Sequence, residues 1–405
     1  MTATVGELEG TAARLRSDVS EGAFCTGTQA YVSRDGEVVM EAAIGRDGLG
    51  RPMTNKTLSA VYCSIKPIIT VLVLLAEQEG LLRLDMSLGE ALELDDNPEL
   101  AAVRLDDLLS HRAGMHELRS VIAAAAPPAT RHALAMAARP AEGWDRRSDA
   151  GYSEWLGFYL IAQLVERACG VELRNALRER VLRPIGIDGE VWLGLIEADL
   201  RRIGVNVDLR DGTPTPLLME RTPWFASAAD PALSGYATMR GLGRFYEWVL
   251  ATLDGRETVP LDPDRLREAC RPHRPVVHDV ILNMDADWGL GFMTGLGRLG
   301  FGPYPSERAV GHTGQVGTSV AFCDPEHELV VALLYNGVIE QATGISERRP
   351  AIVSEIYRDL GIAAAAQGSR PAAAAERPVS RYSPPPASGG AVGSPPPSPG
   401  RSRAR

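Results

Sequence analysis

One short segment, VYCSIKP at residues 61–67, holds side chains that suit nucleophilic chemistry. In a helix, positions i and i+3 share a face, so Cys63 and Lys66 would be neighbours, whereas Ser64 would not face Lys66. A thiol at a helix N-terminus beside a lysine has a lowered pKa, and a neutral lysine can act as a base. The alternative interpretation is a buried structural cysteine with a lysine on the surface.

Lysine is scarce in this chain, which gives Lys66 added weight. Of the 42 basic residues only Lys56 and Lys66 are lysine, and all others are arginine. Arginine stays charged in proteins, whereas lysine can lose its proton in a suitable site. Lysine at position 66 therefore indicates a task that arginine cannot perform, although chance would also account for a single residue.

Two further segments carry groups suited to proton transfer and substrate binding. Tyr152, in GYSEW, precedes an amphipathic stretch, and a tyrosine there can pass a proton to a leaving group. The segment GHTGQVGTS, residues 311–319, can place a histidine and backbone N–H groups along a substrate, because glycines allow close backbone approach. The alternatives are an aromatic anchor for a loop and a glycine-rich turn after a strand.

Together these segments resemble the motifs of serine β-lactamases, penicillin-binding proteins and their esterase and transacylase relatives. That family has Ser-x-x-Lys at the start of a helix, a second motif with tyrosine, and Lys- or His-Thr-Gly on a late strand. The similarity covers about residues 20 to 360, with the stretches EQEGLLRLD, LLSHRAGM, VLRPIGI, DWGLGF and FCDPEHELVVALLYN also in agreement. The positions that match the three motifs, in the family's order, are Cys63 to Lys66, Tyr152 with Ser153, and His312 to Gly314.

The resemblance implies a catalytic role for four side chains. Residue 63 would attack an acyl carbonyl, Lys66 and Tyr152 would share the proton transfers, and His312 would help to orient the substrate. The implied partners are a small-molecule acyl donor (an ester, thioester or amide) and an amine, alcohol or water as acceptor. No cofactor is implied.

The resemblance also implies a set of substrate-binding groups. The backbone N–H groups of Cys63 and Gln315 would form the oxyanion hole, and Thr313 and Gly314 would lie along the substrate. Glu154 stands where many members of the family have asparagine, so an acidic side chain would face the pocket. Histidine in the third motif, as in many esterase-type members, argues against a fixed positive charge for the carboxylate of a β-lactam.

Cysteine at position 63, where the family has serine, leaves three hypotheses open. Cys63 could form a thioester acyl-enzyme and transfer the acyl group to an amine, alcohol or water, since a thiolate is a strong nucleophile. The protein could be an ordinary ester or amide hydrolase that tolerates the replacement, or an inactive binding protein. Retention of Lys66, Tyr152 and His312 argues against an inactive site.

The hydrophobic pattern predicts the elements that position these residues. Two strands around an Arg-Asp-Gly turn, helices ended by glycine, and a late hairpin at DPEHE give strands at both ends of the chain and helices between. We therefore predict an α/β (α+β) fold, with one antiparallel sheet built from both chain ends, flanking helices and an inserted helical lobe. The predicted strands lie at 28–45 and 318–337, and the predicted helices at 63–79, 105–115, 153–170, 234–251 and 349–360.

Composition divides the 405 residues into a foldable body and a tail. We predict a lead-in at 1–19, a catalytic domain at 20–362 and a disordered tail at 363–405, because Ala, Pro, Ser and Arg cannot bury enough apolar surface to fold. The tail is basic, so the formal charge of −10 leaves the body more acidic still, which disfavours nucleic acid as a partner. Within the catalytic domain the sheet lobe is predicted at about 20–75 and 305–362, with the helical and loop lobe at about 76–304.

Several other classes of protein are disfavoured by what the sequence lacks. The N-terminal MTATVGELEG has neither a basic region nor an apolar run, and PIITVLVLLA is too short to span a bilayer, so we expect a cytoplasmic protein without a membrane partner. The five cysteines form no CxxC and the seven histidines no HExxH, so no metal is expected.

GLGRLG matches a dinucleotide fingerprint, but FGPYP follows in place of a helix. There is no GxSxG, which disfavours an α/β-hydrolase. Oligomeric state stays open.

Overall fold

The computed structural model describes residues 8–117, 126–195, 197–339 and 341–363. The predicted tail lies outside the described residues except for Ala363, as do the first seven residues of the predicted lead-in. The boundaries predicted for these terminal segments therefore stay predictions.

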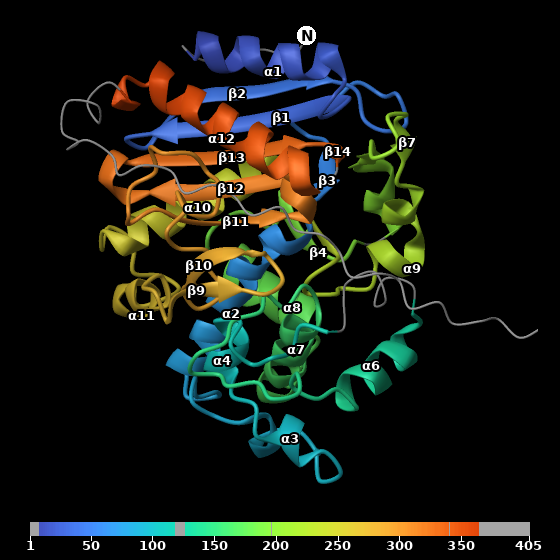
Figure 1. Cartoon of the computed structure of the whole chain (residues 1–405), viewed down its shortest axis with the longest axis vertical. Helices are drawn as coiled ribbons and strands as arrows, with labels where there is room; N and C mark the ends of the chain where they lie inside the picture. The colour runs from blue at the N-terminus through green and yellow to red at the C-terminus, as the bar shows by residue number, and fades with distance from the viewer. Residues whose placement is uncertain (1–7, 118–125, 196, 340, 364–405) are drawn as a thin grey trace, which may run out of the picture.

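A five-stranded antiparallel sheet joins the two ends of the chain, as predicted (Figure 1). Tyr31 of the first strand pairs with Ala332 near the C-terminal end, so the N-terminal hairpin lies beside the C-terminal one. Asp35 and Gly36 form the turn of the N-terminal hairpin with positive φ angles of 53° and 80°, the conformation typical of a two-residue hairpin loop. The strand order is β11 (Val310–Gly314), β12 (Ser319–Asp324), β13 (Leu329–Tyr335), β1 (Gly27–Arg34) and β2 (Glu37–Gly45).

Helices cover both faces of this sheet. The terminal helices α1 (Glu9–Glu21) and α12 (Gln341–Asp359) pack together on one face, and α10 (Met239–Leu253) packs on the other (Figure 1). Strand β13 is buried along its whole length, and its alternate side chains enter two different hydrophobic clusters. This double burial explains the unbroken apolar run of β13, because a strand covered on both faces shows no polar alternation. Gly243 lets α10 lie against β1, since a Cβ there would meet the Tyr31 ring at 2.1 Å.

The helix that carries the first motif is buried on every side. Helix α2 (Lys66–Gln78) has Pro67 in its first turn, where no helical N–H is required, and Gly80 follows its end with a φ of 73°. The predicted start at Cys63 was wrong for the α-helix, because residues Tyr62–Ile65 form a 3₁₀ turn, η1, that precedes it. Cys63 therefore lies in a tighter turn than an α-helix would give.

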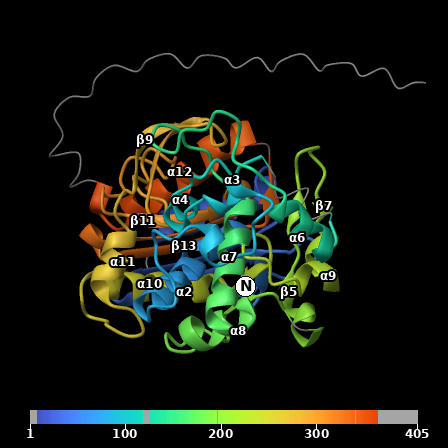
Figure 2. The ribbon, with the colours of Figure 1, turned by 90° about the horizontal axis from the view of Figure 1, so that it is seen from below.

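The remaining helices lie beyond one edge of the main sheet, where α2, α7 and α8 pack side by side (Figure 2). The chain also forms three small sheets, with strand orders β4-β8-β3-β5, β14-β6-β7 and β10-β9. The helices are α3 (Pro98–Ala101), α4 (Leu105–Leu109), α6 (Pro128–Met136), α7 (Leu156–Cys169), α8 (Leu173–Leu177), α9 (Pro223–Ala226) and α11 (Pro263–Ala269). The strands are β3 (Leu58–Ala60), β4 (Val191–Leu193), β5 (Ile203–Gly204), β6 (Val207–Asp208), β7 (Thr215–Pro216), β8 (Gly235–Ala237), β9 (Arg274–Asp279), β10 (Met284–Trp288) and β14 (Gly337–Val338).

Four predicted helix boundaries need correction. The stretch 234–251 begins as strand β8, and α10 starts after Thr238, whose side chain caps it by accepting the Gly241 N–H at 3.0 Å. The helix predicted at 105–115 ends at Leu109, and the one predicted at 153–170 starts three residues late, at Leu156. The terminal helix begins at Gln341, eight residues before its predicted start, because Pro350 lies inside the helix, whereas proline is more typical of a first turn.

The predicted fold class is confirmed: the chain has an antiparallel sheet flanked by helices, with helices inserted between its N- and C-terminal strands. Within the described residues, no helix has the length and apolar character needed to cross a bilayer.

Candidate active site

The structure brings Lys66 and Tyr152 into direct contact beside Cys63. Lys66 Nζ lies 2.9 Å from Tyr152 Oη, 2.9 Å from the carbonyl oxygen of Ser153 and 3.0 Å from that of Glu154. The half-buried Cys63 sulfur lies 3.9 Å from the carbonyl oxygens of Glu154 and Ala232. The start of α2 and the loop before α7, 86 residues apart in sequence, thus meet around one amine.

Burial sets the protonation of these groups. Loss of solvent lowers the pKa of the fully buried Lys66, against a smaller opposing effect of the nearby Cys63 and Glu154. Loss of solvent also raises the pKa of Tyr152 well above its ordinary value, with Cys63 as the next cause. Lys66 is thereby favoured as a proton acceptor, and Tyr152 keeps its proton and serves as a donor.

The loop that carries Tyr152 is held by two residues that the sequence analysis missed. The Tyr152 N–H donates to Asp279 Oδ1 at 3.1 Å, and the Ser153 N–H donates to His111 Nδ1 at 3.1 Å. Ser153 turns its hydroxyl to the carbonyl of Met115 at 2.5 Å, so the serine of the second motif has a structural role here. HRAGM was part of the resemblance, but nothing in that segment signalled a contact with residue 153.

His312, on β11, is neutral in this site. Its Nδ1 lies 2.7 Å from the carbonyl oxygen of Thr313, so Nδ1 carries the proton and donates it. Its buried Nε2 has no hydrogen-bond partner in the described part of the chain. Burial lowers the pKa of His312 to about 3, with the nearby Lys66 as the second cause. Position 312 therefore supplies a neutral acceptor and no positive charge.

This lowered pKa predicts an acid-sensitive fold. The imidazole of an unfolded chain takes up a proton first as the pH falls, so His312 favours unfolding increasingly between pH 6.5 and about 3. In this window the free energy of unfolding should fall less steeply with decreasing pH in His312→Gln than in the parent protein. We expect the two slopes to differ by up to about 1.4 kcal/mol per pH unit, measured by urea denaturation at pH 7, 5.5 and 4.5. The exposed His278 provides the control, because His278→Gln is a surface substitution of the same kind. Equal slopes in all three proteins would contradict the prediction.

The third motif lies against the turn that holds Cys63. A Cβ on Gly314 would stand 2.1 Å from the carbonyl oxygen of Val61, so only glycine allows β11 to approach this closely. Gln315 follows directly at the start of a 3₁₀ turn, and Thr313 is half-buried beside it. Cys63 lies in the first turn of η1, where backbone N–H groups have no helical acceptor. Strand β11, which ends at Gly314 directly before Gln315, contacts the turn η1 that holds Cys63.

Ser64 is a buried structural residue. Its hydroxyl lies 2.8 Å from that of Ser319, which in turn donates to the carbonyl oxygen of Val61 at 2.9 Å. These bonds tie η1 to strand β12. The helical spacing argument that separated Ser64 from Lys66 agrees with this placement.

Asp230 supports the segment opposite the Tyr152 loop. Its buried carboxylate accepts hydrogen bonds from Trp155 Nε1 at 2.7 Å and from the backbone N–H groups of Ala232 and Leu233 at 3.0 and 3.1 Å. The same carboxylate lies 3.4 Å from the Arg131 guanidinium. Asp230 therefore fixes the Ala232 carbonyl that contacts Cys63, and no sequence motif signalled this role.

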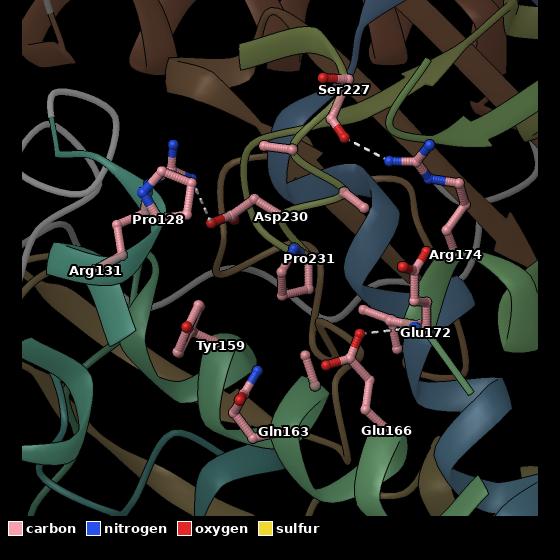
Figure 3. Close-up of a pocket in the computed structure, with 14 residues that line it drawn as sticks. Pro128, Arg131, Tyr159, Gln163, Glu166, Glu172, Arg174, Ser227, Asp230 and Pro231 are labelled. Carbon is pink, nitrogen blue, oxygen red and sulfur yellow. Dashed lines mark hydrogen bonds and ion pairs between the residues drawn. The ribbon is translucent and has the colours of Figure 1, made fainter. Parts of the chain in front are cut away.

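A cavity of about 470 Å³ lies on the other side of this segment (Figure 3). Asp230 and Pro231 form part of its wall, together with one face of α7 that includes Tyr159 and Glu166. Cys63 does not line it. The loop at 230–232 therefore contacts Cys63 through Ala232 and lines this cavity with Asp230 and Pro231.

Among the described residues there is no group of three His, Cys, Asp or Glu side chains that could hold a metal ion. All five cysteines are free thiols.

An antiparallel sheet flanked by helices, with a buried lysine at the start of an inserted helix, defines the β-lactamase- and transpeptidase-like class of fold. Residues 15–352 match the sequence profile of the family described as Beta-lactamase, and the chain belongs to this family. No functionally curated protein matches the chain at a significant level.

Solved structures share this fold at low sequence identity. A penicillin-binding protein homologue from Caulobacter crescentus is 23% identical, with a TM-score of 0.70 over 88% of this chain and 100% of that chain. A family VIII carboxylesterase is 20% identical, with a TM-score of 0.73 over 89% and 99% of the two chains. EstCE1, described as a hydrolase with promiscuous acyltransferase activity, is 15% identical, with a TM-score of 0.70 over 87% and 98%.

Proposed function

We propose that the protein forms an acyl-enzyme on Cys63 and transfers the acyl group from a small ester, thioester or amide to water, an amine or an alcohol. The observation that carries this proposal is the fully buried Lys66 amine, held within 3.0 Å of Tyr152 and of two loop carbonyls beside the thiol. Burying a lysine without a carboxylate bonded to it costs free energy. Such a cost is typical of a catalytic base.

The acylation step uses Lys66 twice, first as a base and then, through Tyr152, as the proton source for the leaving group. Neutral Lys66 takes the proton of the Cys63 thiol, and the thiolate attacks the acyl carbonyl carbon to form a C–S bond. The negative charge that develops on the carbonyl oxygen would be stabilised by the N–H groups of Cys63 and Gln315. The intermediate then collapses to a thioester, and the leaving group departs with a proton passed from Lys66 through Tyr152.

Deacylation repeats the step in reverse. An acceptor O–H or N–H loses its proton through Tyr152 to Lys66, and the acceptor atom attacks the thioester carbonyl carbon. The C–S bond breaks, and the Cys63 thiolate recovers a proton from Lys66. Thioesters react readily with amines, so we expect amines to compete with water for this intermediate.

The charge at the site favours an uncharged acyl group. His312 is neutral, so position 312 supplies no cation for a substrate carboxylate. The carboxylate of Glu154 lies near enough to influence the pKa of both Lys66 and Tyr152, which adds negative charge. Neutral esters and thioesters are therefore proposed as donors in preference to β-lactams. The carboxylesterase and the hydrolase with promiscuous acyltransferase activity, among the structural neighbours, support this class of donor.

Product partition tests the proposal. The protein is incubated with p-nitrophenyl acetate or a short acyl thioester, with and without a primary amine, and acid and amide products are quantified. We expect donor consumption above background and an amide fraction that rises with amine concentration. Hydrolysis alone would assign a hydrolase, and no consumption of any donor would favour an inactive binding protein and overturn the proposal.

A further inference from the structure

The residue before the nucleophile has an unusual backbone conformation. Tyr62 has a φ of +47°, in the left-handed region that bulky L-residues rarely adopt. Its side chain is buried, and the next peptide unit carries the Cys63 N–H. Strain of this kind persists only where the surroundings enforce it, so the contacts of the Tyr62 side chain bear directly on the nucleophile.

The Tyr62 hydroxyl donates a short hydrogen bond to a buried carboxylate, Glu220. Glu220 belongs to the 3₁₀ turn η5 (Leu218–Arg221), 158 residues further along the chain. Its two carboxylate oxygens also accept the backbone N–H of Asn206 and the Asn206 Nδ2 group, each at 2.8 Å. Within the described residues Glu220 has no ion pair, so three donors and no cation stabilise its charge.

Two phenols face Glu220 from different elements. Tyr62 approaches from η1, and Tyr236 of β8 donates its hydroxyl to the backbone carbonyl of Glu220 at 2.7 Å. Burial raises the pKa of both phenols far above neutrality. Burial also raises the pKa of Glu220 to about 7, against the opposing effect of its bonds from Tyr62 and Asn206. Within this cluster Glu220 is therefore the group that titrates near neutral pH.

We propose that Glu220 is a positioning residue for acylation, which holds Tyr62 in its left-handed conformation and thereby sets the direction of the Cys63 N–H and thiol. The inference rests on the proposed function for its link to the oxyanion hole. The geometry is specific, because rotation about the Tyr62 backbone turns the Cys63 N–H directly. Among the described residues, the hydrogen bonds of the Glu220 carboxylate are to Tyr62 and Asn206 and not to Lys66 or Tyr152.

The protonation state of Glu220 changes how firmly it holds Tyr62. The ionised carboxylate accepts three hydrogen bonds, whereas the protonated carboxyl has one acceptor oxygen fewer and must turn its O–H toward one of the groups that otherwise donate to it. Glu220→Gln imposes a similar conflict at every pH, because its NH₂ group replaces one of the two acceptor oxygens of the carboxylate. The variant therefore mimics the protonated state and removes the titration.

The test compares Tyr62→Phe, Glu220→Gln and the double variant, with Tyr236→Phe as the matched control that loses a buried hydroxyl bonded to Glu220 but not to its carboxylate. We expect each single variant to lower acylation kcat/KM by about 10- to 100-fold, and the double variant to be no worse than the single ones. The acylation profile between pH 5 and 9 should lose its inflection near 7 in Glu220→Gln. Tyr236→Phe should stay within about twofold of the parent protein.

Alkylation of Cys63 by iodoacetamide separates this inference from the proposed function, since it needs no acyl substrate. We expect Glu220→Gln to slow alkylation and to change its pH profile even if no acyl donor reacts. Stability provides a further check. Because the pKa of Glu220 is raised in the folded protein, the free energy of unfolding falls as the pH rises from 4.5 to 7. The Tm of Glu220→Gln relative to that of the parent protein should therefore be higher at pH 8 than at pH 5. The inference would be overturned if Tyr62→Phe and Glu220→Gln had the acylation and alkylation profiles of the parent protein. It would also be overturned if the effects of the two substitutions multiplied in the double variant.

Discussion

Replacement of Lys66 by methionine should lower the acylation rate constant by about 10³-fold, since general base catalysis contributes 10² to 10⁴. Methionine fills a similar volume and keeps the apolar surroundings of the start of α2, so the loss reports the amine and not a cavity. Lys66→Arg should be nearly as inactive, because arginine holds its charge and cannot accept the thiol proton. The measurement is the rate constant of p-nitrophenol release under single-turnover conditions.

The chain offers a matched control for this prediction. Lys56 is its only other lysine, and its side chain is exposed. Lys56→Met should leave the acylation rate within about twofold of the parent, as expected for a surface substitution. Parent-like acylation in Lys66→Met would show that another group activates the nucleophile.

Replacement of Cys63 should have the largest effect of all. We expect Cys63→Ala to reduce donor consumption to background, because the acyl group has no atom to which it can be attached. We expect Cys63→Ser to lose at least about 10²-fold, because an alcohol releases its proton far less readily than a thiol and Lys66 has a lowered pKa. The half-buried Cys169, at the end of α7, provides the control.

The Cys63→Ser result also distinguishes two explanations for the cysteine at position 63. A collapse of activity indicates a site adjusted to a thiol, whereas a gain indicates that cysteine replaced serine without such adjustment. Cys169→Ala should retain parent activity in either case, and its loss would show that the cysteine effects are not specific to position 63.

Local sequence signals were enough to predict the main sheet. The N-terminal hairpin was confirmed because Asp35 and Gly36 fit a turn that only a few residue types adopt. The C-terminal hairpin was confirmed because Pro325 separates two apolar runs, of which β13 is buried on both faces. Helical spacing and the scarcity of lysine singled out Lys66, and the family resemblance paired it with Tyr152; the structure places the two side chains 2.9 Å apart.

Contacts between distant segments could not be predicted from the sequence. Glu220 is separated from Tyr62 by 158 residues and lies in no recognisable motif. Asp279 supports the Tyr152 loop from a hairpin 127 residues away. The 3₁₀ turn before α2 was missed for a related reason: its left-handed Tyr62 is enforced by tertiary contacts, and local propensity would not favour it.

The most direct test of Cys63 as the nucleophile is the intact mass of the protein after brief incubation with an activated ester, followed by peptide mapping. We expect the mass to increase by one acyl group, and peptide mapping to locate this group on Cys63. The adduct should be lost on addition of a primary amine and should be absent in Cys63→Ala. The same adduct should form in Cys169→Ala. An adduct on Ser64 or elsewhere, or no adduct with any ester, thioester or β-lactam, would contradict the assignment of Cys63 as the nucleophile.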